Sequence, residues 1–369
     1  MRRRPLWDWA LPLLVVAAPA EAQRFGSGGG TVGAEALTYR FGPNFGVRSL
    51  SQWALPVAIV VSRGRTMVDV GTYLASTSLE RRDGTSLRVT GFTDTQVRGA
   101  YVVGQDAVVL TAVVNLPTGA SELTLAEYAV LASASSSFLA FPVNAYGSGA
   151  SLTAGAAAAL PAGAWNLGLA GSIRLSDDFT PFRDADGGFT YRAGLETRLR
   201  AGADRLVGPA RLSLGLTFST FSNDEFANGS GVTGVYRPGT RFIVEASYAT
   251  AVGATSVIAY AWDFLRLAGD SAGTDTKNRE NVLAGGARLI VPLGRRVFFE
   301  PGLEGRATWP EEGQGALLQF TSALRLRLTR RLTILPALRL NLGRLEEPPP
   351  GIGHQIWAYG LSVFIRESF

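Results

Sequence analysis

The sequence predicts an all-β fold, a transmembrane antiparallel up-and-down β-barrel of about sixteen strands. Three observations lead to this prediction. Apolar residues alternate with small or polar residues over segments of about ten to fifteen residues, which is the periodicity of strands. The connections between these segments alternate between short and long. The last segment, residues 358–369, keeps the alternation and ends on the aromatic residue Phe369.

The clearest predicted strand covers residues 211–219. Its apolar positions are Leu212, Leu214, Leu216 and Phe218, and the positions between them are small or polar. Residues 165–175 and 318–328 repeat this division. A soluble β-sandwich would show the same two faces. The length of the segments distinguishes a sandwich from a membrane barrel. Soluble strands cluster near about five or six residues, whereas tilted strands that cross a bilayer need about nine to eleven.

The connections are predicted to be long on one side of the membrane and short on the other. Outer-membrane barrels place their short turns toward the periplasm. With Phe369 on that side, the outer connections are residues 42–51, 83–93, 117–147, 177–188, 222–238, 269–280, 310–314 and 345–353. This alternation gives about sixteen strands, with both termini in the periplasm. Fourteen strands is the alternative, because residues 31–41 and 86–92 are weakly patterned.

The composition excludes several classes of protein. The chain of 369 residues has no cysteine, which excludes disulfides and thiolate metal sites. Its formal net charge is +5, but the arginines are scattered and the one basic run is Arg2 to Arg4, so we expect no nucleic-acid partner. The 44 glycines and the aromatic content of 10% suit the turns and interfacial girdles of a membrane barrel. We expect no cofactor and no metal site.

Three segments are predicted along the chain. Residues 1–22 form a secretory signal peptide, because three arginines precede a short apolar run and the small-residue motif Ala20-Glu21-Ala22. The apolar run of roughly nine residues is shorter than the ~20 residues that a spanning helix needs. Residues 23–30, which are rich in glycine, form a flexible leader. Residues 31–369 form the outer-membrane barrel.

The C-terminal segment predicts the cellular location. Its alternation and its final Phe369 resemble the C-terminal signal of Gram-negative outer-membrane β-barrels, which closes the barrel and is read by the assembly machinery. Glu367 departs from that signal, since it stands where an apolar or aromatic residue is usual. The resemblance implies a multi-pass protein of the cell outer membrane. Its partners would be outer-membrane lipid, lipopolysaccharide and the barrel-assembly machinery.

One stretch departs from strand periodicity. Residues 124–140 are predicted to form a short helix in the longest outer loop. Thr124 and Glu127 match a capping box, and Tyr128, Leu131 and Phe138 recur at helical spacing. Such a helix can cover the mouth of the barrel, or fold into the lumen and narrow it. In the alternative, it packs on the loop and has no gating role.

If the apolar faces meet lipid, the residues between them line the lumen. The lumen-lining candidates are Arg98, Arg174, Arg192, Glu196, Arg198, Arg211, Glu245, Arg288, Glu300, Glu304, Arg306, Arg325, Arg327 and Arg339. Because arginines outnumber carboxylates among them, an open lumen would favour anions. In the alternative, these charges pair across neighbouring strands and fill the lumen as structural ion pairs.

Aromatic and acidic residues add to the pattern. The aromatic residues expected on the outward face, as an interfacial girdle, are Trp53, Tyr101, Trp165, Tyr191, Phe218, Tyr248, Tyr260, Trp262, Trp309, Trp357 and Tyr359. The short turns are basic and the long loops are acidic. The acidic loops lack the spacing of a calcium motif, so we interpret them as a solvated surface.

The sequence offers little for catalysis. His354 is the only histidine, and we place it at the rim before the last strand. Ser362, the nearest lumen-side serine of that strand, is eight residues away and therefore beyond hydrogen-bond reach. A hydrolase would need a serine from another strand, so we expect no enzyme.

Two further runs carry a resemblance to a family. Thr93-Asp94-Thr95-Gln96-Val97-Arg98 and Asn115-Leu116-Pro117-Thr118-Gly119, with the signal peptide and Phe369, resemble the Gram-negative porin-like barrels grouped with transporters for aromatic or fatty compounds, including the phenol meta-pathway type. The resemblance implies passive passage of small, often hydrophobic molecules and transfers no binding residue. We therefore expect a porin-like channel or passive transporter for a small hydrophobic or anionic solute. The alternatives are a closed structural or adhesive barrel and, third, an outer-membrane hydrolase that uses His354.

Overall fold

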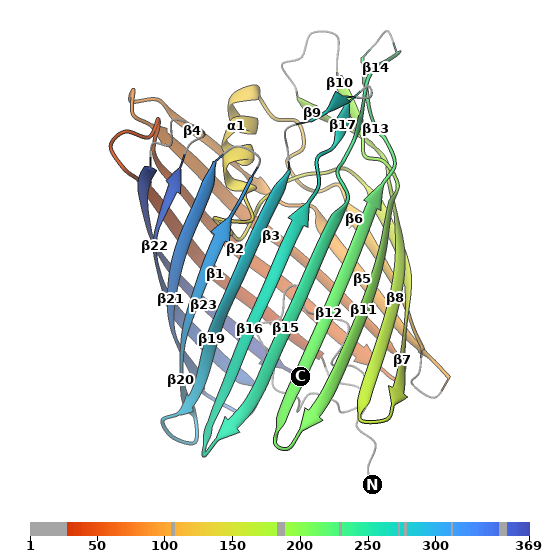
Figure 1. Cartoon of the computed structure of the whole chain (residues 1–369), viewed down its shortest axis with the longest axis vertical. Coiled ribbons are helices and arrows are strands. Elements are labelled where there is room, and N and C mark those ends of the chain that lie inside the picture. The colour runs from red at the N-terminus through yellow and green to blue at the C-terminus, as the bar shows by residue number, and fades with distance from the viewer. Residues whose placement is uncertain are drawn as a thin grey trace.

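The computed structural model describes residues 28–104, 108–182, 189–228, 231–271, 274–276, 279–310, 313–346 and 353–369. The predicted signal peptide, residues 1–22, and residues 23–27 of the predicted leader lie outside these ranges. Long tilted strands form a closed wall around a lumen (Figure 1). The strands of the wall are β1 (Gly28–Phe41), β2 (Val47–Arg63), β3 (Thr66–Arg81), β4 (Ser86–Phe92), β5 (Thr95–Val103), β6 (Val108–Leu116), β7 (Ser151–Ala162), β8 (Trp165–Ser176), β11 (Glu196–Val207), β12 (Ala210–Phe221), β15 (Arg241–Val252), β16 (Thr255–Arg266), β19 (Glu280–Pro292), β20 (Val297–Thr308), β21 (Gln314–Arg327), β22 (Leu332–Glu346) and β23 (Gly353–Ser368).

The wall has sixteen strand positions, as predicted. β4 and β5 share one position, because both pair with β3, β4 with its outer part and β5 with its inner part. Residues 86–92, which the sequence pattern placed in the outer connection 83–93, therefore belong to the wall. The first outer connection is also shorter than predicted, since β2 begins at Val47. The alternative of fourteen strands is wrong.

Pairing of the first and last strands closes the barrel. β1 runs antiparallel to β23 over its whole length, and Gly28 and Phe369 exchange two backbone hydrogen bonds of 2.9 Å. Because β1 begins at Gly28, residues 28–30 of the predicted leader are paired strand residues. This pairing of the first strand with the last removes the two free edges that an open sheet would have, which is the condition for a sheet in a bilayer.

The short turns lie at the end of the barrel that holds the C-terminus (Figure 1). Gly64 joins β2 to β3 and Gly163 joins β7 to β8, with φ of 60° and 62°. A left-handed φ of this kind is strained for other residues, so glycine suits these two tight turns. The long connections and their secondary structure lie at the opposite end, as the alternation of lengths predicted.

The outer surface of the wall is apolar. Leu169, Leu342 and Leu361 are each exposed by 64–65%, and many further aliphatic side chains share this face. Large exposed apolar surface is unfavourable in water, at roughly 25 cal/mol per Å², but it is favourable against lipid. The residues of the predicted girdle with more than two-fifths of their surface exposed are Trp53, Tyr101, Tyr248, Trp309, Trp357 and Tyr359. The chain is therefore a multi-pass transmembrane barrel of the Gram-negative outer-membrane type. In the described residues, no helix is long and apolar enough to cross a membrane.

β16 faces the opposite way from the prediction. Trp262 pairs with Ala284, a buried inward position, and the Tyr260 hydroxyl donates to the lumen carboxylate of Glu304 at 2.7 Å. Both rings therefore lie inside the barrel and not in the outer girdle. Asp263 of the same strand pairs with the exposed Leu283 and faces outward. Tyr191 is not in the girdle either, because it belongs to a sheet above the wall, described next.

Three outer connections form a second sheet above the barrel, which we call the crown (Figure 1). Its strands are β9 (Asp178–Phe182), β10 (Phe189–Arg192), β13 (Asp224–Asn228), β14 (Gly231–Arg237), β17 (Asp270–Ser271) and β18 (Thr274–Asp275). They pair in the order β18-β17-β14-β13-β10-β9. The predicted loops 177–188, 222–238 and 269–280 thus contain strands that pair with one another.

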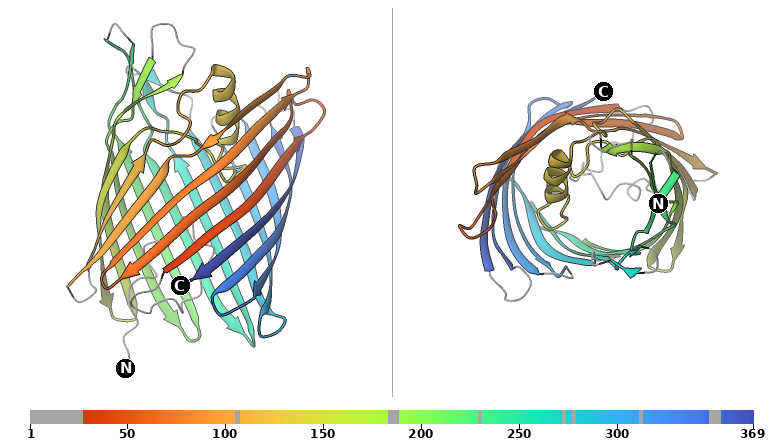
Figure 2. Two further views of the ribbon diagram at one scale, coloured as in Figure 1. Left: turned by 180° about the vertical axis from the view of Figure 1, so that it is seen from behind. Right: turned by 90° about the horizontal axis from the view of Figure 1, so that it is seen from above.

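The longest connection, residues 117–150, folds back into the barrel, and we call it the plug. It contains the helix α1 (Leu125–Ala134), which lies inside the ring of strands when the barrel is viewed along its axis (Figure 2). The predicted capping box of Thr124 and Glu127 is present. The helix ends six residues before the predicted Ala140, where Ser135 caps it. The buried hydrophobic core lies between the plug and the inner wall.

Candidate functional site

A buried carboxylate fixes both ends of the plug. Asp94 occupies the interruption between β4 and β5 and is 8% exposed. Its Oδ1 accepts from the Gly119 backbone N–H at 3.0 Å, and its Oδ2 accepts from the Ser148 N–H at 2.7 Å. Oδ2 also accepts from Asn115 Nδ2 at 2.7 Å. One side chain therefore joins the start of the plug, its end and the preceding strand β6.

A glutamine fixes the middle of the plug. Gln52 on β2 is buried, and its Nε2 donates to the Val143 carbonyl at 2.7 Å while its Oε1 accepts from the Val143 N–H at 2.8 Å. Gln52 Nε2 also donates to Thr77 Oγ1 at 2.8 Å, and the Thr77 hydroxyl contacts the Tyr146 hydroxyl at 3.0 Å. The amide therefore pairs with a plug residue as a neighbouring strand would.

A third group of bonds holds the turn after α1. The Tyr39 hydroxyl on β1 donates to the Leu139 carbonyl at 2.7 Å and accepts from Asn341 Nδ2 at 2.8 Å. On the other side of the plug, Arg306 Nη1 donates to the Phe138 carbonyl at 3.2 Å. These bonds satisfy backbone groups that would otherwise be buried without a partner. The plug is therefore hydrogen-bonded directly to β1, β2 and β20, and Asn341 of β22 supports it through Tyr39.

Apolar packing reinforces this attachment. The buried plug side chains are Leu123, Val130, Leu131, Ala134, Phe138, Leu139, Phe141, Val143 and Tyr146. They pack against inward residues of β1 to β4, β19, β21 and β23, namely Leu37, Tyr39, Phe41, Leu50, Ala54, Ala75, Leu79, Val89, Val282, Leu317, Ile356 and Ala358. Where these strands contact the plug, near the outer end of the barrel, their inward side chains are apolar because they form a hydrophobic core with the plug. We call this the plug side of the wall.

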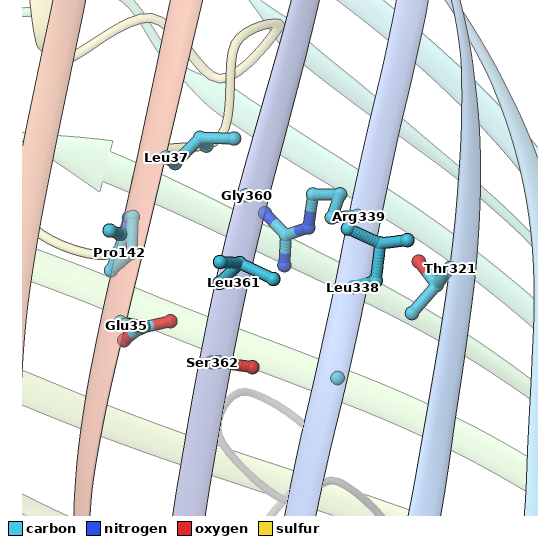
Figure 3. Close-up of a pocket in the computed structure, with 11 residues that line it drawn as sticks. Glu35, Leu37, Pro142, Thr321, Leu338, Arg339, Gly360, Leu361 and Ser362 are labelled. Carbon is cyan, nitrogen blue, oxygen red and sulfur yellow. The ribbon is translucent and has the colours of Figure 1, made fainter.

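A small cavity of about 40 Å³ lies beside Pro142 of the plug. Figure 3 shows the Arg339 side chain extending from β22 across Gly360 of β23, while Glu35 of β1 points toward it from the other side. Gly360 pairs with Arg339 on one side and with Leu37 on the other. A Cβ atom on Gly360 would lie 2.9 Å from the Ala36 carbonyl oxygen, so glycine permits this close packing.

On the strands away from the plug, inward charges remain accessible to water. We call β5 to β8, β11, β12 and β15 the open side of the wall. The ion pairs there are Arg98–Asp69 at 2.8 Å, with Asp69 from β3, Arg198–Glu196 at 2.7 Å, Arg200–Glu245 at 2.6 Å and Arg211–Asp204 at 3.3 Å. Their arginine side chains are 30–47% exposed. Since these side chains face the lumen, the lumen along this side is open to water.

On the plug side, two inward ion-pair groups of β20 are buried. Arg306 pairs with Glu304 at 2.5 Å, and both side chains are 9% exposed. Glu300 is fully buried and pairs with both Arg325, at 2.6 Å, and Arg288. Many of the predicted lumen charges are therefore paired across or along strands, which is the structural alternative raised from the sequence.

The remaining sequence candidates fall into two groups. Arg174, Arg327 and Arg339 lie on inward positions of β8, β21 and β22, and no carboxylate of the described residues lies within 4.0 Å of their guanidinium nitrogens. Arg192 is placed differently from the prediction. It lies on β10 of the crown, where Asp178 and Glu225 pair with it at 2.5 and 3.9 Å, so it does not line the wall.

His354 and the acidic loops do not form a catalytic or metal centre in the described structure. His354 is 3% exposed at the outer rim and packs edge-on against Phe45, with ring centroids 5.1 Å apart. Ser362 lies eight residues further along the same strand, toward the inner end, about 26 Å away at 3.3 Å per residue. Among the described residues, no group of three or more acidic, histidine or cysteine side chains could hold a metal ion.

Sequence reasoning missed the residues that hold the plug. Gln52, Tyr39 and Asn341 are polar residues at inward positions of strands, but an uncharged residue there looks like any lumen residue. Asp94 and Asn115 were noticed only as parts of two separate runs. The structure joins these runs, because Thr118 Oγ1 also accepts from the Thr95 N–H at 2.9 Å.

The wall, the apolar exterior and the inward plug define a transmembrane β-barrel of the outer-membrane type with an internal plug. No protein-family model matches the sequence, and no curated protein does. Solved structures with a similar fold include a mutant of the TodX monoaromatic hydrocarbon channel, which is 10% identical with a TM-score of 0.48 over 94% of this chain and 91% of that one. The CymD monoaromatic hydrocarbon channel is 11% identical, with a TM-score of 0.45 over 95% and 90%. The Pseudomonas putida toluene transporter TodX is 10% identical, with a TM-score of 0.43 over 93% and 89%.

Proposed function

We propose that the protein is a passive, porin-like channel of the outer membrane through which small solutes pass beside the plug. The observation that carries this proposal is the difference between the two sides of the wall. Arg198 on the open side keeps 47% of its side chain exposed inside the barrel, whereas Arg306 on the plug side keeps 9%. A plug that filled the whole lumen would bury both. The plug therefore narrows the lumen and leaves a water-filled path along the open side.

Swelling of proteoliposomes tests this function. Purified protein in liposomes should admit neutral sugars at a rate that falls steeply with their size, because the plug narrows the path. Heat-denatured protein in the same liposomes provides the control. Rates equal to those of protein-free liposomes for every solute would contradict the channel and favour a closed barrel.

Two solute classes are candidates. Arginines outnumber carboxylates on the inward face, which favours anions. A row of aromatic rings supports small apolar solutes: it runs from Tyr128 of α1 through Phe182, Phe189, Phe226, Tyr191 and Phe179 of the crown, with successive centroids 5.0–5.8 Å apart. Uptake of toluene compared with benzoate distinguishes the two classes. A Phe182→Ala variant should slow toluene selectively if the rings collect apolar solutes.

The alternatives have less support. A closed structural or adhesive barrel requires that the open-side charges be buried, and they are not. A hydrolase requires a nucleophile near His354, which lies under Phe45. We therefore propose that the protein is not an enzyme. We also propose that its outer rim contacts lipopolysaccharide and that the assembly machinery recognises β23. Binding of a peptide of residues 353–369 to the purified machinery would test the second of these.

A further inference from the structure

Four arginines gather on the lumen wall near its inner, periplasmic end. Arg288 lies near the inner end of β19, Arg325 and Arg327 end β21, and Arg366 lies two residues before the end of β23. All four occupy inward positions, because they alternate with the outward side chains of their strands. We call them the basic cluster. Arg288 and Arg325 are near neighbours, because both pair with the Glu300 carboxylate.

One carboxylate pairs with two of the four arginines of the basic cluster. Glu300 on β20 pairs with Arg288 and Arg325 and is itself fully buried. Arg327 and Arg366 have no carboxylate of the described residues within 4.0 Å. Four guanidinium groups and one glutamate leave a net charge of about +3 on this part of the wall. On the open side, by contrast, each of four arginines has a carboxylate partner of its own: Arg98, Arg198, Arg200 and Arg211.

The two arginines without a carboxylate flank a hydroxyl group. Arg327 pairs with Thr333 of β22, and Thr333 pairs with Arg366 of β23, so the three side chains form one row on the inner face. Neighbouring strands are about 4.8 Å apart, which places Arg327 and Arg366 about 10 Å apart at their backbones. Thr333 is small enough to leave space between them.

The contacts of Arg327 leave its donors available. Its guanidinium carbon lies 4.8 Å from the centroid of the Phe298 ring. A guanidinium that stacks on a ring keeps its N–H donors in its own plane, where they match the oxygens of a carboxylate or phosphate. The Thr333 hydroxyl adds a further donor. Basic residues of the adjoining turns, Arg295, Arg296, Arg330 and Arg331, raise the positive potential at this end of the barrel.

We infer that Arg327, Thr333 and Arg366 form an oxyanion-binding site in the lumen, for the carboxylate or phosphate group of a small solute. The site rests on the proposed channel function, because its ligand would reach it through the lumen. It adds a specific binding position to the general preference of a basic lumen. It lies near the periplasmic end, where a bound anion neutralises the excess charge of the basic cluster.

Inorganic phosphate is the probe for the site. Single channels in planar bilayers, bathed in potassium chloride, should lose conductance saturably as phosphate is added on the periplasmic side. Replacing both arginines, as Arg327→Gln with Arg366→Gln, should raise the half-effective phosphate concentration about tenfold or more, because two charge-assisted hydrogen bonds are lost. The matched control is Arg174→Gln with Arg339→Gln, which removes the same charge from inward positions and should leave the half-effective concentration unchanged.

Two readouts separate this site from the channel itself. Line broadening of the phosphorus-31 NMR signal of phosphate, measured with purified protein in detergent, reports binding without conduction. Heat-modifiable gel migration verifies that each variant is folded. Broadening that the first variant abolishes and the control retains supports the site even if no channel conducts. An equal response of both variants, or a phosphate effect that never saturates, would overturn the site and leave only a general basic field.

Discussion

Asn115 Nδ2 donates to Asp94 Oδ2 at 2.7 Å, and this bond connects strand β6 to the interruption between β4 and β5. The same carboxylate accepts from the Gly119 N–H, the Ser148 N–H and the Ser148 hydroxyl. The carboxylate therefore accepts four hydrogen bonds, one at Oδ1 and three at Oδ2. The start and the end of the plug therefore lie side by side, and hydrogen bonds to Asp94 hold both of them to the wall.

Asp94→Asn should loosen the plug. The amide keeps one acceptor oxygen and turns its NH₂ group toward N–H donors, which costs roughly 1–3 kcal/mol for the group left unsatisfied. We expect larger and noisier single-channel conductance and a lower midpoint of urea unfolding. Asp83→Asn is the control, because Asp83 lies in a short exposed outer connection and its Oδ1 acceptor for the Thr85 N–H is kept. Identical traces for the two variants would refute the anchoring role of Asp94.

Gln52→Leu should release the middle of the plug. The substitution leaves the N–H and carbonyl of Val143 buried without their partner, at roughly 1–3 kcal/mol for each group. Since the bonds at Asp94 remain, we expect frequent transitions to a higher conductance rather than a permanent change. Gln355→Leu, at an exposed outward position of β23, should behave as the wild-type protein. Unchanged gating in Gln52→Leu would show that apolar packing alone holds the plug.

Gly360→Ala should impair folding of the barrel seam. The added Cβ would lie 2.9 Å from the Ala36 carbonyl and 3.1 Å from Leu37, between the strands that close the barrel. Overpacking of this kind costs about 1–3 kcal/mol. We expect a lower yield of the heat-modifiable form on refolding. Gly99→Ala is the matched control, because its nearest neighbour would be 4.0 Å away; equal yields would argue against tight packing at Gly360.

Tyr191→Phe should loosen the crown. The Tyr191 hydroxyl donates to Asp224 Oδ2 at 2.6 Å, and burial together with this carboxylate raises the pKa of Tyr191, so the phenol stays a neutral donor. Loss of the bond costs about 1 kcal/mol, which corresponds to about fivefold more opening. Limited proteolysis of the crown should accelerate accordingly. Tyr101→Phe, on the exposed outer face, should leave the cleavage rate unchanged.

Local pattern was sufficient for much of the fold. Alternation and the lengths of the connections predicted the sixteen strand positions, and Thr124 with Glu127 predicted the start of α1. These features depend on residues close together in the sequence. The end of α1 was predicted too late, because the Ser133 and Ser135 hydroxyls bond to the carbonyls of Ala129 and Ala132 and compete with the helical pattern.

The sequence predictions were wrong for the orientation of β16 and the location of Arg192, because contacts between residues far apart in the sequence determine both. Both faces of β16 carry apolar residues, since Trp262 and Phe264 face the core beside the plug and Leu265 faces outward. Alternation cannot choose between two apolar faces. The crown strands are short and pair between loops that are far apart in the sequence. Arg192 was placed in the lumen for this reason, although its ion pairs belong to the crown.

Thiol accessibility tests the central claim, a water-filled path beside the plug, most directly. Because the chain has no cysteine, single cysteines can be introduced without background. Ser213→Cys places a thiol on the inward face of β12, and Ala54→Cys places one at a fully buried position on the plug side. A charged, membrane-impermeant thiosulfonate should modify the first thiol within seconds and reduce its single-channel conductance, and it should leave the second unmodified. An unreactive thiol at residue 213 in the folded protein, or equal reaction at both positions, would contradict the path.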